Sequence, residues 1–424
     1  MIVAALLACV AAQPLDAAGG SPGDAAAAPA ARPSPAEHRF SFAGVPTATF
    51  NTDEGFGTGG VGTMYHQHGG VAPYRDAFTL NVFISSKLVQ AHAITWDALR
   101  PFDIPGRALV KLGYYSTVSQ NYCGVGNEVT CAPGDAVARA RALGFADGTA
   151  AFEDFVRRYY LMRFIRPYAT LLARPWLRDK PWRTELLVGW RGALTIPGEL
   201  AALAPYPDNR FAEDHPDGEP GFSSVPTLGL IVDDRDAETF PTRGFFFEAS
   251  GRAAHPWWGG TSTWAGANAS GSFFVEMERA PRLVLATRFL VDVIAGEPSV
   301  EEMARIGGTT DWIAFGGHVL GRGVREHRYL GKLKLIGQAE LRAQLYRHDV
   351  WGEQLDHGVA VFSDVGWIGY DVADLRGRAV KLLGGVGISY RLLWNETFSV
   401  RADLAVSPDE AEGPGFYVIV GQAF

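Results

Sequence analysis

Hydrophobic and polar residues alternate along several long segments of the chain. The clearest is Lys332–His348, in which apolar side chains share one face of an extended strand and polar side chains share the other. The apolar face carries Leu333, Leu335, Ala339, Leu341, Ala343 and Leu345, and the polar face carries Lys334, Gln338, Glu340, Arg342 and Gln344. Because successive side chains of a strand point to opposite faces, one face can meet lipid while the other meets water.

The same alternation recurs in Asp76–Ser85, Ala379–Trp394 and Thr397–Ser407. A soluble β-sandwich would also alternate, so the length of the strands decides between the two folds. Strands of soluble sheets are usually ~5–6 residues long, whereas a strand that crosses a bilayer needs ~9–11 residues. The segments here reach the longer value, which predicts transmembrane strands.

The connections between the predicted strands also favour a barrel. From about Phe42 onward the pattern predicts about sixteen strands, and their linkers alternate between short and long, like the periplasmic turns and external loops of outer-membrane barrels. The short linkers include Pro101–Gly106, Leu177–Pro181, Thr239–Thr242, Arg279–Pro281 and Asn395–Glu396, and the long ones include 119–157, 197–224, 297–330 and 408–414. We therefore predict an all-β fold, a transmembrane antiparallel β-barrel of about 16 strands.

Composition agrees with this fold. The chain has 424 residues with 50 glycines, 12% aromatic residues and only 20% charged residues, which suits many strands separated by tight turns. Its mean hydropathy is +0.01, and beyond the N-terminus no segment supplies the ~18 consecutive apolar residues of a membrane-spanning helix. The net charge of -8 argues against a nucleic-acid partner, which usually requires a basic surface.

The N-terminal residues predict export. Residues 1–18 are typical of a secretory signal peptide, because the unbroken apolar run Ile2–Ala12 ends in small residues. Residues 19–38 are rich in Ala, Pro and Gly and predict a flexible linker. Residues 39–424 then form the barrel, and the predicted location is the bacterial outer membrane.

Two cysteines, Cys123 and Cys131, flank a short polar loop that contains glycine. In an exported protein this spacing favours a disulfide. Two free thiols or a metal pair are the alternatives, and no Cys/His spacing typical of a zinc site supports them.

Thr227–Gly244, TLGLIVDDRDAETFPTRG, resembles a strand–turn–strand of the bacterial surface antigen family, the BamA/TamA-type outer-membrane assembly barrels. That family carries D-x-R-D followed by a proline and a glycine at a periplasmic turn. The matching residues are Asp233, Arg235, Asp236, Pro241 and Gly244. Pro241 and Gly244 would set a tight turn, and the charged side chains would lie at the wet end of the lumen.

A second segment, Phe315–Lys332, resembles the sixth external loop of the same family, which folds inward and carries an Arg-Gly-aromatic motif. Arg322 and Gly323 match the motif, and Val324 replaces the aromatic residue. The resemblance implies that Arg322 reaches into the barrel and pairs with acidic residues of the next two strands, here Glu340 and Asp364. The alternation independently places Glu340 on the polar face. The alternative is that Arg322 is a solvated loop arginine without a specific role.

The C-terminus, GFYVIVGQAF, ends on the aromatic residue Phe424 and resembles the terminal strand by which outer-membrane proteins are recognised for insertion. The resemblance is clear over about residues 225–424 and rests on general pattern before that. Only about 25 linker residues precede the first strand, below the ~40–50 residues of a small folded domain. The expectation is a barrel-only member without periplasmic POTRA domains.

The resemblance implies insertion or translocation of client proteins, with outer-membrane lipid, unfolded outer-membrane proteins and a separate periplasmic module as partners. The alternative is a passive pore or surface-display barrel without insertase activity. No enzyme motif such as GxSxG, HExxH or a P-loop is present, so we expect no enzyme and no cofactor. His66 and His68 share one face of an early strand and could bind a metal, but a pair without a third ligand is more typical of a polar lumen, and no metal site is predicted.

Overall fold

The computed structural model describes residues 38–420, apart from residues 53, 69, 72–73, 127–128, 130, 239, 278–281, 310–314, 351–352, 371–373, 375–381, 395–397 and 410–412. The predicted signal peptide, all but the last residue of the predicted linker, and the predicted insertion signal at Phe424 lie outside these residues.

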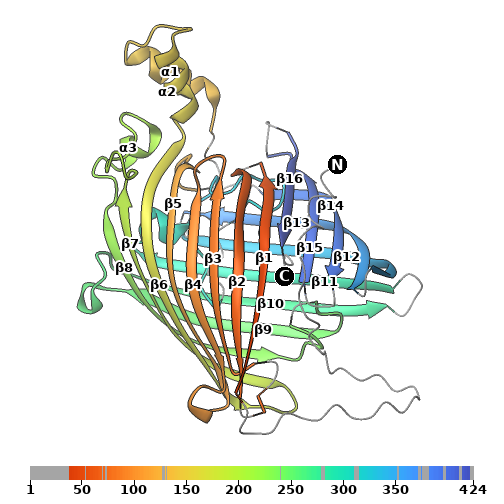
Figure 1. The fold of residues 1–424 in the computed structure, drawn as a ribbon. Coiled ribbons are helices and arrows are strands. Elements are labelled where there is room, and N and C mark those ends of the chain that lie inside the picture. The colour runs from red at the N-terminus through yellow and green to blue at the C-terminus, as the bar shows by residue number, and fades with distance from the viewer. Residues whose placement is uncertain are drawn as a thin grey trace, which may run out of the picture.

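The described chain forms sixteen antiparallel strands that close into one barrel, in which each strand pairs with its neighbours in sequence and β1 pairs with β16 (Figure 1). The predicted fold class is therefore confirmed. The strands are β1 (Arg39–Asn51), β2 (Gly55–Gln67), β3 (Asp76–Ser85), β4 (Gln90–Leu99), β5 (Gly106–Asn121), β6 (Leu161–Arg178), β7 (Arg183–Pro197), β8 (Gly221–Asp233), β9 (Gly244–Ala254), β10 (Trp264–Met277), β11 (Arg282–Gly296), β12 (Leu333–Val350), β13 (Glu353–Gly369), β14 (Leu383–Trp394), β15 (Phe398–Val406) and β16 (Gly415–Val420).

Short helices lie only in the connections. They are η2 (Pro101–Asp103), α1 (Pro133–Ala142), α2 (Ala150–Arg158), α3 (Arg210–Asp214), η3 (Pro256–Trp258) and α4 (Val300–Met303). In Figure 1, α1 and α2 stand well above the barrel wall. In the described residues, none of these helices is long and apolar enough to cross a membrane.

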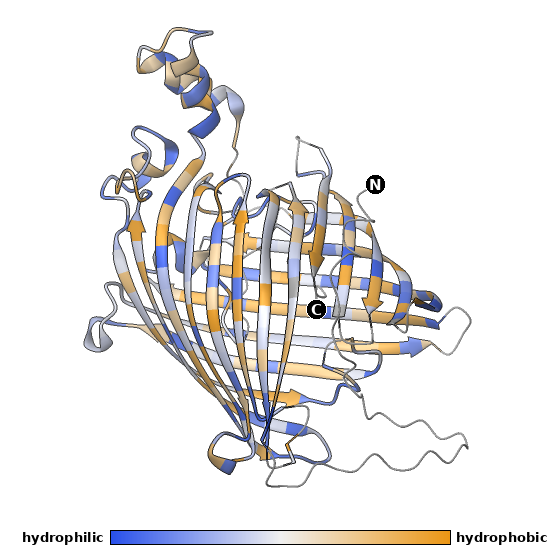
Figure 2. Ribbon diagram, in the orientation of Figure 1, coloured by the Kyte–Doolittle hydropathy of each residue, from blue (hydrophilic) through white to orange (hydrophobic). Residues whose placement is uncertain are grey.

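Hydrophobic and hydrophilic residues alternate along many strands of the wall (Figure 2), and the exposure of their side chains shows that the two faces differ as the alternation predicts. On β3, Phe78, Leu80, Val82 and Ile84 are exposed on the outer face. On β12, Leu341 and Leu345 are exposed, while the polar face carrying Lys334, Gln338, Glu340 and Arg342 is buried inside the lumen. The outer face can therefore meet lipid, and the charged side chains are kept inside.

The alternation of β12 breaks near its C-terminal end. The register with β13 shifts between Gln344 and Tyr346, and Tyr346 is exposed beside Leu345 instead of facing the lumen. A β-bulge inserts one residue into a strand and reverses the faces beyond it, which the polar pattern alone did not reveal.

Candidate functional site

The described part of the loop between β11 and β12 packs against the inside of the barrel wall. Its apolar side chains join those of the wall in one buried cluster, made of Leu290, Ile306, Phe315, Leu320, Val324, Tyr329, Ile336, Ile368 and Leu383. Val324, which stands in the place of the family's aromatic residue, is fully buried there. The loop therefore packs inside the barrel as a plug with its own apolar core.

Arg322 lies at the tip of this loop and is fully buried. Its Nε and Nη2 donate to Asp364 of β13, each at 2.9 Å, and its Nη1 donates to Glu340 of β12 at 2.7 Å. Its backbone N–H also donates to Asp364 at 2.9 Å. The guanidinium stacks over the Phe362 ring, 3.5 Å from the centroid. The structure thus brings together the three side chains that the resemblance implied.

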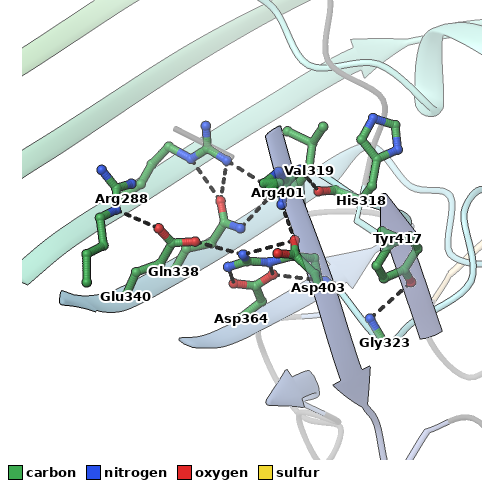
Figure 3. A network of polar contacts seen from close by, with 12 residues as sticks. Arg288, His318, Val319, Gly323, Gln338, Glu340, Asp364, Arg401, Asp403 and Tyr417 are labelled. Atoms are coloured by element: carbon green, nitrogen blue, oxygen red, sulfur yellow. Dashed lines mark hydrogen bonds and ion pairs between the residues drawn. The ribbon is translucent and has the colours of Figure 1, made fainter. Parts of the chain in front are cut away.

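The glycine after this arginine meets the last two strands. Gly323 has a φ of +94°, and a Cβ there would lie 3.1 Å from the backbone of Val406 on β15. Its N–H donates to the hydroxyl of Tyr417 on β16 at 3.2 Å (Figure 3). A residue with a side chain would be strained at this φ and crowded against β15, so glycine fits the position.

Two further arginines hold the loop backbone (Figure 3). Arg401 of β15 donates to the carbonyl of His318 and pairs with Asp403. Arg288 of β11 donates to Gln338 at 2.9 Å, and the amide of Gln338 donates to the carbonyl of Val319 at 2.9 Å. These contacts join the loop tip to the wall formed by β11, β12 and β15.

The start of the same loop is anchored on the opposite wall, a feature that the sequence did not suggest. Glu301 and Glu302 of α4 pair with Arg166 of β6 and Arg191 of β7. Burial works to raise the pKa of Glu301, but the guanidinium of Arg166 and its neighbours outweigh it and lower the pKa to about 2. Both carboxylates therefore stay charged and paired at neutral pH.

The seam between the first and last strands is short. Only Phe50↔Val418 and Asn51↔Tyr417 pair β1 with the described part of β16. By contrast, β1 pairs with β2 along its whole length, from Arg39↔Gln67 to Asn51↔Gly55. Most of β1 thus has a neighbour on one side only within the described residues, which is the property of an edge strand.

The predicted periplasmic turn motif lies between β8 and β9. Asp233 pairs with Arg183 at 2.7 Å and with Arg235 at 2.9 Å. Asp236 accepts hydrogen bonds from the Thr242 hydroxyl and from the backbone N–H groups of Ala237, Thr242 and Arg243. Pro241 is buried. Gly244 has a φ of +96°, and a Cβ at this position would clash with the Asp234 carbonyl oxygen. Each residue of the motif thus helps to fix the turn.

Cys123 and Cys131 form a disulfide, with their Cα atoms 5.2 Å apart. It lies at the base of the external connection that carries α1 and α2. Those helices share a small apolar cluster built on Ala136, Ala140, Phe155 and Tyr159. The hairpin rests on α3 through an ion pair between Arg139 and Glu213 and a hydrogen bond from the Tyr159 hydroxyl to Glu213.

His66 and His68 do not face the lumen, contrary to the interpretation favoured from the sequence. His66 lies opposite Phe40 of β1, which is exposed on the outer face, and the two rings stack. Its Nδ1 lies 3.0 Å from the carboxylate of Asp76. Within the part of the chain that the structure describes, no group of three or more His, Cys, Asp or Glu side chains is arranged to hold a metal ion.

Comparison with known proteins identifies the family. The model of the Omp85 superfamily domain matches residues 206–424, about half of the chain. This chain belongs to the Omp85 superfamily. No relative was found among curated proteins.

Solved structures agree with the Omp85 fold. BamA from Haemophilus ducreyi lacking POTRA domains 1–3 matches 91% of this chain and 70% of its own, with a TM-score of 0.52 and 11% identity. CdiB from Escherichia coli matches 88% of this chain with a TM-score of 0.53, and CdiB from Acinetobacter baumannii matches 90% with a TM-score of 0.50, each at 12% identity. This chain spans 62% and 59% of the two CdiB chains. At such identities the likeness concerns the fold.

Proposed function

We propose that this Omp85 barrel is an outer-membrane protein assembly factor, which inserts client proteins into the bacterial outer membrane through the seam between β1 and β16. The observation that carries the proposal is the short seam, with two residue pairs in the described chain. Within the described part of the seam, Ile419 and Val420 of β16 pair with β15, and the pairs between β16 and β1 do not include them. An unpaired strand edge can accept a new strand by β-augmentation.

The sequence of β1 supports the same reading. Pro46 lies in the middle of β1, and proline has no N–H to donate to a ladder. Prolines within sheets are confined to edge strands, first residues and bulges. Because Pro46 lacks an N–H, it weakens strand pairing, and this loss is small on a side of β1 that has to open. The partners of such a factor are outer-membrane lipid, unfolded outer-membrane proteins and a periplasmic module that delivers them.

The plug also favours assembly over passive conduction. The loop spans the lumen from Arg166 and Arg191 on one wall to Asp364 and Tyr417 on the other. A barrel of this strand number encloses a channel unless loops block it. The alternative, a surface-display barrel, is favoured by one feature, the disulfide-clasped hairpin of α1 and α2 that stands outside the wall.

The test is the folding rate of a model outer-membrane protein in liposomes with and without the purified barrel. Insertion through the seam predicts a clear acceleration, which a disulfide between Phe50→Cys and Val418→Cys should abolish and a reductant should restore. These two residues face each other across the seam. A barrel that gives no acceleration in either redox state would contradict the proposal and favour the display function.

A further inference from the structure

The turn between β8 and β9, described at residues 234–238 and 240–243, reaches across the periplasmic mouth of the barrel. On one side, Glu238 accepts a hydrogen bond from Nη1 of Arg107 on β5 at 2.9 Å. On the other side, the ring centroid of Phe240 lies 5.9 Å from the guanidinium carbon of Arg342 on β12. In the closed order of sixteen strands, β5 and β12 are seven places apart, almost half of the circumference. One short turn thus touches two nearly opposite walls.

The turn is held in this position. Asp236 ties its two ends through the Thr242 hydroxyl and three backbone N–H groups. Arg235 forms two hydrogen bonds with Asp233, at 2.9 and 3.0 Å, and donates to the carbonyl of Glu238 at 3.3 Å. With Pro241 and Thr242 buried, the turn does not extend freely into the periplasm.

The two wall residues that the turn contacts, Arg107 and Arg342, are themselves held by hydrogen bonds. Arg107 donates to Asp97 at 2.8 Å, and Asp97 also accepts from Tyr74 at 2.9 Å. Arg342 donates to Glu340 at 2.8 Å, the carboxylate that also holds Arg322 of the plug. The inner turn therefore contacts Arg342, the outer loop contacts Glu340, and these two wall residues are bonded to each other.

A polar cavity lies further inside, against the plug. Its volume is about 150 Å³, and the residues lining it include Lys111, Tyr115, Arg166, Ala193, Glu301 and Ala304. On β5, Lys111 and Tyr115 come after Arg107, which lies at the periplasmic end of the strand. The turn bound to Arg107 thus lies between this cavity and the periplasm.

We propose that the β8–β9 turn is an inner lid, which closes the lumen on the periplasmic side while the β11–β12 loop closes it on the external side. The lid is fastened by Glu238 to Arg107 and by Phe240 to Arg342. Opening the lid exposes the cavity to the periplasm without movement of the plug. This inference is independent of the seam and holds for an insertase or a display barrel alike.

The experiment places a cysteine in the cavity and measures how fast it reacts. The variant Ala193→Cys, refolded in vesicles, is treated with a membrane-impermeant thiol reagent, and molecules with their periplasmic turns toward the reagent are identified by protection of the α1–α2 hairpin from protease. Adding Glu238→Gln and Phe240→Ala removes both fastenings. The Glu238–Arg107 pair is partly exposed and the Phe240–Arg342 contact is a single cation–π pair, so each contact is weak by itself. Losing both should change the opening equilibrium, and with it the labelling rate, by about tenfold.

The matched control makes the same kind of chemical change in the β4–β5 turn, at the same end of the barrel, with Phe102→Ala and Asp103→Asn. These side chains are exposed and do not cross the mouth, so labelling should stay at the rate of Ala193→Cys alone. Glu238→Gln by itself leaves the rest of the turn intact and should give an intermediate rate if the double variant folds poorly. Equal rates in lid and control variants, or rapid labelling with the lid intact, would overturn the proposal.

Discussion

The backbone N–H of Gly323 and the hydroxyl of Tyr417 are joined by a hydrogen bond of 3.2 Å, which connects the tip of the plug to the last strand of the barrel. Tyr417 is almost fully buried, and it lies opposite Asn51 in the seam. Its ring packs with Phe362, over which the Arg322 guanidinium stacks. The plug and the seam therefore share one set of contacts.

Replacing Tyr417 with Phe removes this hydrogen bond and keeps the ring. We expect a loss of about 1 kcal/mol in the pairing of β16, seen as faster hydrogen exchange of the β16 amides with little change in the melting temperature. Tyr346→Phe, on the outer face of β12, is the control and should leave β16 unchanged. Equal exchange in the two variants would mean that the hydroxyl does not hold the strand.

Replacing Arg322 with Ala should loosen the plug and lower the melting temperature of the refolded barrel in detergent. The variant leaves Asp364 buried without its guanidinium, and breaking a buried ion pair costs about 3–5 kcal/mol. Protease cleavage between residues 315 and 332 should become faster. An unchanged melting temperature together with unchanged cleavage would contradict the conclusion that Arg322 holds the plug to the wall.

A second substitution identifies which carboxylate is left unpaired when Arg322 is removed. Asp364→Asn added to Arg322→Ala should recover part of the stability, because a neutral amide is less costly to bury than an unpaired carboxylate. Glu340→Gln in the same background should recover none, since Glu340 keeps its partners Arg342 and Arg391. Equal recovery by the two changes would argue against this division of roles.

Placing Arg at Leu341 tests the assignment of the outer face. A charged residue facing lipid costs about 2–4 kcal/mol at the middle of the membrane and about 0–1 kcal/mol near its surfaces. Leu392→Arg, close to the periplasmic end of β14, is the depth control. The equilibrium for folding into vesicles, measured by urea titration, should fall for Leu341→Arg and change little for Leu392→Arg. If Leu341→Arg folded as well as the natural protein, the assignment of Leu341 to the lipid-facing side would be wrong.

The inner turn should lose its order in acid. Partial burial works to raise the pKa of Asp236, but hydrogen bonds from Thr242 and the neighbouring amides outweigh it and hold the pKa below its usual value. A carboxyl with a lowered folded-state pKa stabilises the fold above its unfolded value of about 3.9, and this contribution disappears as the pH falls through the folded pKa. Pepsin cleavage of the turn should therefore be slower than in Asp236→Asn near pH 4.5, and the difference should shrink as the pH is lowered further below about 3.9. If the ratio of the two cleavage rates did not change with pH, the Asp236 carboxylate would not be the group that stabilises the turn.

Much of the wall was predictable because alternation is a local property. Asp76–Ser85 was predicted with the bounds that β3 has, and the polar face of β12 placed Glu340 in the lumen before any contact was known. The partners of Arg322 came from resemblance combined with that alternation. The resemblance to assembly barrels and the strand number are confirmed by the family match and by the closed barrel.

The contacts made between distant segments were not predictable. Glu301 meets Arg166 at a sequence separation of 135 residues, and neither residue lies in a motif that names the other. The outward position of His66 depends on the register of β1 and β2, which a strand pattern alone does not fix. The helix α2 did leave a signal, since Thr149 caps it and Phe152, Phe155, Val156 and Tyr159 recur at helical spacing.

The hairpin of α1 and α2 has its own apolar cluster, and none of its members belongs to the cluster at its base, which contains Tyr122, Met162 and Phe211. Substitutions on its outer surface therefore leave the wall, the plug and the seam unstrained. The hairpin can therefore accept a different sequence on its outer surface without a compensating change in the barrel beneath it.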